Sequence, residues 1–126
     1  MSHKNTKTGA VGEQLAKEYL IKKGYIILAT NWRAKHKEID IIAKHKDVLV
    51  FVEVKTRRST KFGFPEEAVT TKKWQLLFLA AQAFIEQYTN YERIQFDIIS
   101  VALKNKQMKD SETEIVHYDD AFYGNN

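Results

Sequence analysis

Two acidic side chains and one lysine stand out because they interrupt apolar segments. Asp40 lies between Ile39 and Ile41, and Glu53 and Lys55 alternate with valines in the run Val-Phe-Val-Glu-Val-Lys. Side chains two apart in a strand project from the same face, about 7 Å apart along the chain, so Glu53 and Lys55 should point the same way. Two carboxylates beside an ammonium are groups that can hold a hard divalent ion and act on a water molecule.

Metal-dependent hydrolysis of a phosphodiester is the chemistry that suits these groups. Burying carboxylates without partners is costly, and a cation such as Mg²⁺ or Mn²⁺ would compensate for that cost. Lys55 could orient or deprotonate the attacking water and neutralise charge on the phosphate. The alternative is that Glu53 and Lys55 are exposed strand residues and that Asp40 and Lys55 form an ordinary ion pair, because acid-x-Lys triplets are frequent by chance.

A hairpin is needed to bring Asp40 beside Glu53. Strand-like patterns cover residues 38–44 and 48–57, and the short polar stretch between them predicts a tight turn. The near-continuous apolar character of residues 48–57 is typical of a central strand covered on both faces. A further strand is expected at residues 25–32.

Two helices are predicted from apolar positions at helical spacing, over residues 9–23 and about 70–88. Thr8 is expected to cap the first helix and Gly24 to end it. On a helical wheel Glu13 lies about 20° from Leu20, on the rim of the buried face.

Strands at residues 94–103 and 114–118 complete the predicted order, αβββαβ plus a short C-terminal strand, which is expected at an edge of the sheet. Because a strand, a long helix and another strand imply a parallel crossover, the central β-sheet should be mixed and flanked by helices. The sequence therefore predicts the α/β class.

The 126 residues allow one domain. We expect a flexible basic arm at residues 1–8, a single domain at 9–122 and a disordered tail at 123–126. The chain has no cysteine, which excludes disulfides, thiolate metal sites and cysteine nucleophiles. No apolar run approaches the roughly 20 residues that cross a bilayer, so a cytoplasmic protein with no membrane contact is expected.

Charge is distributed unevenly along the chain. All 20 lysines and arginines precede Asp110, whereas five of the 16 acidic side chains lie from that residue onward. A basic body attracts polyanions such as nucleic acid, although a solvated lysine-rich surface gives the same composition.

Basic side chains near the predicted site have two interpretations. Arg33, Arg57 and Arg58 lie at strand ends, where they could bind phosphates or serve only for solubility. Lys72 and Lys73 lie in the first turn of the long helix, where the helix dipole disfavours cations, so a bound anion would explain them. Tolerance of a small penalty on a solvated turn is the alternative.

Other polar and aromatic residues are expected to be structural. Trp32 could stack on a base but is expected to pack in or beside the core. The four histidines show no His-x-x-x-His spacing, so no zinc site is expected. Asp97 alternates with apolar residues in its strand and is expected to have a structural or supporting role.

Five groups of residues together resemble the YraN-like family. They are Gly9, Gly12 and Glu13; the strand from Tyr25 to Arg33; Glu38-Ile39-Asp40; the run from Val50 to Arg57; and Phe62-Gly63, Ala68-Val69, Lys72 and Phe96-Asp97. This family of small, largely uncharacterised bacterial proteins is similar to the PD-(D/E)XK nucleases, and especially to archaeal Holliday-junction resolvases. The resemblance runs from about Gly9 to Phe122. Lys37 departs from it, since the family usually has glycine there.

The resemblance implies a restriction-endonuclease-like fold and a metal-dependent DNA endonuclease. Glu13, Asp40 and Glu53 would hold Mg²⁺ or Mn²⁺ together with the backbone carbonyl of Val54, and Lys55 would be the lysine of the signature. A homodimer would suit the cutting of both strands of a symmetric junction.

Two other functions remain open from the sequence. The chain could be a DNA-binding module that keeps the nuclease fold and the basic surface without catalysis. It could also be a protein-interaction scaffold whose charged residues form only ion pairs. Resemblance to a nuclease fold does not by itself establish cleavage.

Overall fold

The computed structural model describes residues 7–34, 37–57, 71–103 and 113–121. The elements in chain order are α1 (Lys7–Lys22), β1 (Ile26–Ala34), β2 (Lys37–His45), β3 (Val48–Arg57), α2 (Thr71–Ile85), β4 (Arg93–Leu103) and β5 (Thr113–Tyr118). This order confirms the predicted α/β class and the short C-terminal strand. It also agrees with the expected restriction-endonuclease-like fold.

The five strands form one mixed sheet in the order β1-β2-β3-β4-β5. Only β3 and β4 are parallel, and the other neighbours are antiparallel. The predicted crossover through α2, the central position of β3 and the edge position of β5 are therefore confirmed. The β2–β3 hairpin turns through Lys46 and Asp47, and the Asp47 carbonyl accepts hydrogen bonds from the backbone N–H groups of Glu92 (2.8 Å) and Arg93 (3.2 Å).

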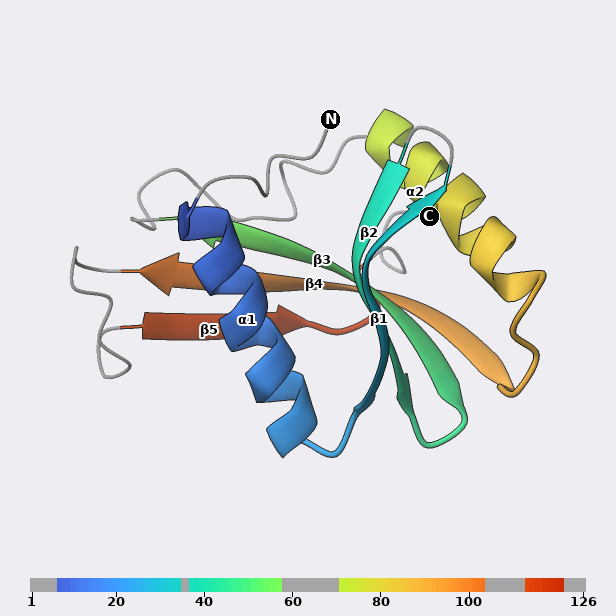
Figure 1. The fold of residues 1–126 in the computed structure, drawn as a ribbon, viewed down its shortest axis with the longest axis horizontal. Helices are drawn as coiled ribbons and strands as arrows, with labels where there is room; N and C mark the ends of the chain where they lie inside the picture. The colour runs from blue at the N-terminus through green and yellow to red at the C-terminus, as the bar shows by residue number, and fades with distance from the viewer. Residues whose placement is uncertain (1–6, 35–36, 58–70, 104–112, 122–126) are drawn as a thin grey trace.

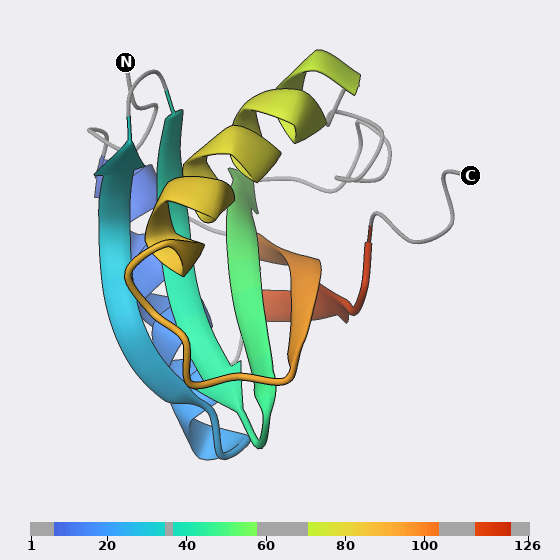
Figure 2. The ribbon, with the colours of Figure 1, turned by 90° about the vertical axis from the view of Figure 1, so that its right-hand side faces the viewer.

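The two helices cover opposite faces of this sheet, as Figures 1 and 2 show. Ala16 and Leu20 of α1 pack on one face of the strands, against valines of β3 and the alternate residues of β2 and β4. Trp74 and Phe84 of α2 pack on the other face, around Phe51. Successive residues of β3 thus face different helices, which explains its continuous apolar pattern.

Both helices differ from their predicted limits by a few residues. α1 begins at Lys7, so Thr8 lies inside the first turn instead of capping it. α2 ends at Ile85. The Glu86 N–H still bonds to the Gln82 carbonyl (3.0 Å), but the bonds after it are tighter i→i−3 turns, from Gln87 N–H to the Phe84 carbonyl (3.0 Å) and from Tyr88 N–H to the Ile85 carbonyl (3.3 Å). The rest of the predicted arm and the tail at 123–126 lie outside the described residues.

Gly24 ends α1 as the sequence predicts. Its φ of 93° is left-handed, a conformation that glycine adopts without steric cost. The N–H of Gly24 bonds to the Ile21 carbonyl (3.0 Å), and that of Tyr25 bonds to the Leu20 carbonyl (3.0 Å). This pair of bonds is the Schellman motif, and it directs the chain from α1 into β1.

Gly12 lets α1 approach the end of β3 closely. A Cβ atom at this position would collide with Thr56 Oγ1 and would lie only 2.7 Å from its Cγ2. Because glycine has no Cβ atom, α1 can lie this close to the strand that carries Glu53 and Lys55.

The outer strand β1 is irregular. Its pairing with β2 shifts register between Ile27 and Ala29, and Asn31 adopts a φ of 49°. These features bend an edge of the sheet that has no further strand beside it among the described residues.

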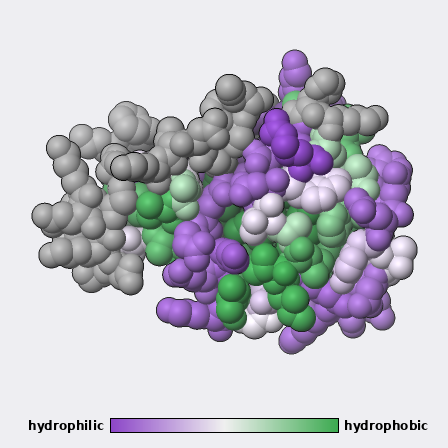
Figure 3. Space-filling model, viewed as in Figure 1, coloured by the Kyte–Doolittle hydropathy of each residue, from purple (hydrophilic) through white to green (hydrophobic). Residues whose placement is uncertain are grey.

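The surface around the core is mixed in character. Figure 3 shows hydrophobic side chains gathered in the middle of one face and hydrophilic ones around them. Ile26 is 62% exposed and Ile21 is 50% exposed, where α1 passes into β1. Within the described ranges, neither helix is long and apolar enough to span a membrane.

We predict that Gly12→Ala lowers the free energy of unfolding by about 1–3 kcal/mol, because overpacking against Thr56 outweighs the higher helix propensity of alanine. Urea unfolding measures the change. Thr56→Ala in the same chain removes the colliding Oγ1 and Cγ2 atoms and should restore part of the loss, because the Cβ atom of residue 56, 2.8 Å from the added atom, remains. Gln14→Ala on the exposed side of α1 is the control. A Gly12→Ala variant as stable as the parent would contradict the close approach.

Candidate functional site

Glu53 is held between two lysines near the end of β3. Lys55 Nζ lies 3.6 Å from Glu53 Oε2, and Lys37 Nζ lies 3.4 Å from Glu53 Oε1. The Glu53 side chain is 12% exposed and the lysines are about one-fifth exposed. Because Phe51 packs under α2, the alternation of β3 places Glu53 and Lys55 on the α2 face of the sheet. The prediction that these two side chains project together is therefore confirmed.

The Asp40 side chain bonds to β3 just beyond the point where the backbone pairing of β2 and β3 ends. The last residue pair of that ladder is Ile41 with Val52. Beyond it, Asp40 Oδ2 accepts a hydrogen bond of 2.7 Å from the backbone N–H of Val54. Asp40 is only 3% exposed, so its carboxylate joins the two strands at a buried position. The site thus has one acidic side chain in the gap between the strands and a second, Glu53, on β3 next to Val54, whose N–H donates to Asp40.

Glu13 belongs to α1, on the other face of the sheet. Its Oε1 accepts a hydrogen bond of 2.9 Å from Asn31 Nδ2 on β1. The ligand atoms of Glu13, Asp40 and Glu53 do not form a group within 4.8 Å of one another, whereas another trio of described residues does. The sharing of one ion by these three carboxylates, with the Val54 carbonyl, stays a prediction.

The predicted phosphate-binding side chains are distributed around this region. Arg33 is 60% exposed and lies 4.0 Å from Glu38 Oε1. Arg57 is partly buried, and its Nε has no hydrogen-bond partner among the described residues. Lys72 and Lys73 are exposed in the first turn of α2, which contains no acidic side chain. Arg58 lies outside the described residues.

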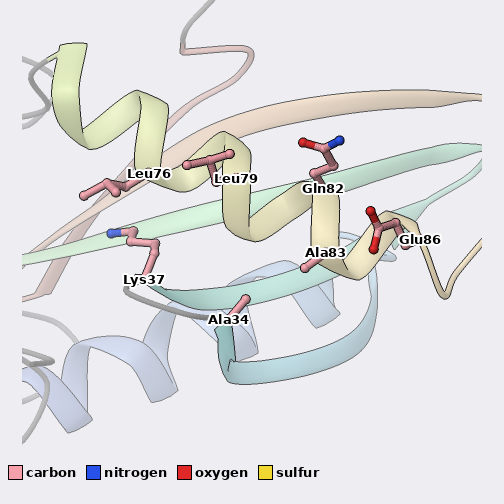
Figure 4. A pocket seen from close by; sticks show the side chains of 7 residues that line it. All are labelled: Ala34, Lys37, Leu76, Leu79, Gln82, Ala83 and Glu86. Carbon is pink, nitrogen blue, oxygen red and sulfur yellow. The ribbon is translucent and has the colours of Figure 1, made fainter.

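A pocket of about 310 Å³ adjoins the Glu53 cluster through Lys37. It is lined by Ala34 and Lys37 on the β1–β2 side and by five residues of α2 and the turn after it: Leu76, Leu79, Gln82, Ala83 and Glu86. Figure 4 shows the Lys37 side chain extending beneath the helix on the side of Leu76. Lys37 is therefore a member of both the ion-pair cluster and the pocket wall.

A second polar group lies on the α1 face of the sheet. His117 Nε2 donates to Asp97 Oδ2 at 2.7 Å and lies 3.2 Å from Asp119 Oδ1. One ligand atom from each of these three residues lies within 4.8 Å of the others, so the group could hold a metal ion. Histidine spacing alone does not reveal this group, because its ligands come from different parts of the chain, and the expectation of no zinc site stays a prediction.

Hydrogen bonds hold this second group in place. Asp97 Oδ1 accepts from Gln95 Nε2 (3.0 Å) and from the backbone N–H of Asp120 (2.9 Å). The Tyr19 hydroxyl lies 3.2 Å from His117 Nδ1. Asp97 is fully buried, so these bonds compensate its removal from water.

Sequence reasoning missed Lys37 and the assembly of Asp97, His117 and Asp119. The only signal for Lys37 is its place three residues before Asp40. His117-x-Asp119 near the end of the chain is a usable signal, because Asp119 lies two positions after His117, in the turn that directly follows its strand. Trp32 packs edge-to-face on Phe84, with ring centroids 5.4 Å apart, which favours its packing role.

We predict that Tyr25 ionises later than ordinary tyrosines. Burial, then the negative charges of Asp97 and Asp119 and the neighbouring Tyr19, raise the pKa of Tyr25 from 10.0 to about 12. Because the neutral phenol is the favoured form, its contribution to stability is complete below pH 10 and is lost as the pH rises toward 12 and above. Alkaline absorbance titration of the parent and of Tyr25→Phe should differ only near pH 12. A difference centred near pH 10 would contradict the assignment.

We predict that Asp40→Ala destabilises the fold by about 1–3 kcal/mol, because the buried Val54 N–H loses its acceptor. Asp40→Asn keeps an oxygen at this position and should lose less. Urea unfolding measures both, with Asp47→Asn at the exposed hairpin turn as the control. If Asp40→Ala unfolds at the same urea concentration as the control, the strand-joining role of Asp40 is wrong.

The comparisons with known proteins agree on one family. The model of the uncharacterised protein family UPF0102 matches residues 12–101. A UPF0102 protein of Flavobacterium psychrophilum is 46% identical over 115 residues, which cover 91% of this chain and 92% of that protein. A UPF0102 protein of Caldanaerobacter subterraneus is 48% identical over 111 residues, with 86% and 90% covered. One from Rhodococcus opacus is 40% identical over 123 residues, with 97% and 100% covered.

These matches confirm the YraN-like family that the sequence resembles. They extend over Asp40, Glu53 and Lys55 as well as the sheet that positions them. The chain belongs to the uncharacterised protein family UPF0102.

Proposed function

We propose that this protein is a metal-dependent DNA endonuclease that hydrolyses phosphodiester bonds, with a resolvase-like preference for branched DNA. The observation that carries the proposal is the arrangement at the end of the β2–β3 ladder. There a buried Asp40 bridges the separating strands, and Glu53 lies between two ammonium groups on the central strand.

The available ligand atoms are of the kind that a hard divalent cation binds. Asp40 and Glu53 offer carboxylate oxygens, and the Val54 carbonyl adds a backbone oxygen, all of the type that Mg²⁺ and Mn²⁺ prefer. Glu13 is the further ligand that the family resemblance would add from α1; in this structure its Oε1 accepts a hydrogen bond from Asn31 Nδ2 of β1. When bound, the ion would polarise the phosphate and lower the pKa of a water molecule.

The lysines supply the positive charge that a phosphate substrate requires. Lys55 lies beside Glu53 and is assigned to orient the attacking water or to receive its proton. Lys37 neutralises the second oxygen of Glu53 and provides another ammonium at the edge of the pocket. Both lysines are partly exposed, so a phosphate can reach them from solvent.

DNA is the substrate class that the charge favours. The sequence carries a formal net charge of +4, and all of its basic side chains precede the acidic C-terminal part. Exposed positive charge is added by Arg33 near the end of β1 and by Lys72 and Lys73 in the first turn of α2. We place the enzyme in the cytoplasm and expect a homodimer to cut the two strands of a junction.

We predict that the purified full-length protein cleaves four-way junction, flap, single-stranded or duplex DNA in the presence of Mn²⁺. Denaturing gels of end-labelled DNA measure the rate. Asp40→Asn, Glu53→Gln and Lys55→Met should each reduce that rate at least about 100-fold, since each removes an ion ligand or a proton-transfer group. Asp47→Asn, at the opposite end of β3, should cleave like the parent.

The outcomes separate the proposal from its rivals. Cleavage that is unchanged in Asp40→Asn and Glu53→Gln would exclude this site. Salt-sensitive DNA binding without cleavage of any substrate would support a binding module of nuclease fold and overturn the enzymatic assignment. If neither DNA nor Mn²⁺ binds, the ion pairs of Glu53 are structural and a protein-interaction scaffold is the better assignment.

A further inference from the structure

We propose that Asp97, His117 and Asp119 form a second site for a divalent metal ion, with Zn²⁺ as the preferred ion. The site is separate from the proposed nuclease centre. Phe96 and Ile98 pack in the cluster under α2, so the alternation of β4 places Asp97 on the α1 face. Glu53 projects from the opposite face of the sheet.

The three ligand atoms already converge on one point. His117 Nε2 lies 2.7 Å from Asp97 Oδ2 and 3.2 Å from Asp119 Oδ1. A tetrahedral zinc ion with bonds of about 2.1 Å places its ligand atoms about 3.4 Å apart. The ion would take the place of the hydrogen on Nε2 as the neutral imidazole changes from its Nε2–H to its Nδ1–H tautomer, so no net proton is released. The His117–Asp97 contact would open by about 0.7 Å, from 2.7 Å to the ligand spacing of the ion.

The surrounding hydrogen bonds orient each donor toward that point. With Nε2 on the metal, Nδ1 carries the proton and donates to the Tyr19 hydroxyl 3.2 Å away. The Tyr19 hydroxyl also accepts from Lys23 Nζ at 3.3 Å. Gln95 and the Asp120 backbone bind the other oxygen of Asp97 and leave Oδ2 for the ion. Metal-binding histidines and carboxylates are characteristically held by such outer partners.

Charge provides a separate argument. Two carboxylates lie against a single imidazole nitrogen, and its one N–H can donate a strong hydrogen bond to only one of them. The His117 side chain is 5% exposed and Asp97 is 0% exposed, so water does little to screen this part of the group. A divalent cation would satisfy both carboxylates and the nitrogen at once.

The donor types favour a borderline transition metal. Imidazole nitrogen binds Zn²⁺ well, whereas Mg²⁺ prefers an all-oxygen site and keeps most of its water. Three protein ligands leave a fourth position for a water molecule. Asp119 is 71% exposed, so an ion can enter from its side.

Bound zinc would attach the last strand to the rest of the fold. Asp97 belongs to β4, His117 to β5, and Asp119 to the turn that follows β5. The ion would thus add a link between these elements and, through Tyr19, would connect them with α1.

Calorimetric titration of the full-length protein, first freed of metal with a chelator, tests this site. We expect one Zn²⁺ per chain, a rise in melting temperature on binding, and visible absorption bands of a four-coordinate ion when Co²⁺ replaces Zn²⁺. Asp119→Asn should weaken Zn²⁺ binding at least about 10-fold and remove those bands. This side chain is exposed, so the variant should fold. His117→Gln should do the same if it folds.

Matched variants show which residues bind the Zn²⁺ ion. Asp120→Asn changes the neighbouring exposed carboxylate and should bind like the parent. Asp40→Asn with Glu53→Gln should also keep Zn²⁺ binding, so failure of the nuclease proposal leaves this one intact. Zn²⁺ affinity that is unchanged in Asp119→Asn would overturn the site, as would no binding by the parent at millimolar Zn²⁺. Equal affinity for Mg²⁺ and Zn²⁺ would contradict the role of His117.

Discussion

The hydrogen bond from the Val54 N–H to the Asp40 carboxylate is the contact on which the candidate nuclease site depends. Two antiparallel strands that separate inside a protein leave backbone groups without partners, and such groups are costly to bury. Asp40 Oδ2 supplies the missing acceptor at 2.7 Å, just beyond the last residue pair of the β2–β3 ladder. One acidic side chain therefore joins the two strands next to the residue that follows Glu53 on β3. Asp40 thus has a structural role as the acceptor for Val54 and a proposed chemical role as an ion ligand.

The two polar groups balance their charges in different ways. Glu53 is neutralised by two lysines, which are long, partly exposed and able to move toward a substrate. Asp97 is fully buried and is held by a histidine, an amide side chain and a backbone N–H. The first arrangement leaves cations facing solvent, and the second encloses the charge. The first arrangement therefore suits an anionic substrate with its catalytic ion, and the second suits an ion that stays bound in the fold.

The sequence was sufficient for most of the fold because each element carries its own periodic pattern. The apolar run of β3, the two polar residues of its hairpin and the strand-helix-strand order together specify a central strand and a parallel neighbour. The pairing of Glu53 with Lys55 follows from strand alternation alone. The assembly of Asp97 with His117 does not, because it depends on the pairing of β4 with β5 across a long gap in sequence. Lys37 has no pattern of its own, and its contact with Glu53 arises from the approach of β2 to β3.

The irregular outer strand has a consequence for contacts between molecules. A straight edge strand offers an even row of backbone donors and acceptors on which another chain can polymerise. The register shift near Ile27 and the left-handed Asn31 interrupt that row on β1, and β5 at the other edge is only six residues long. The two edge strands of the sheet are therefore poor templates for the addition of further chains, even though the protein has exposed apolar side chains.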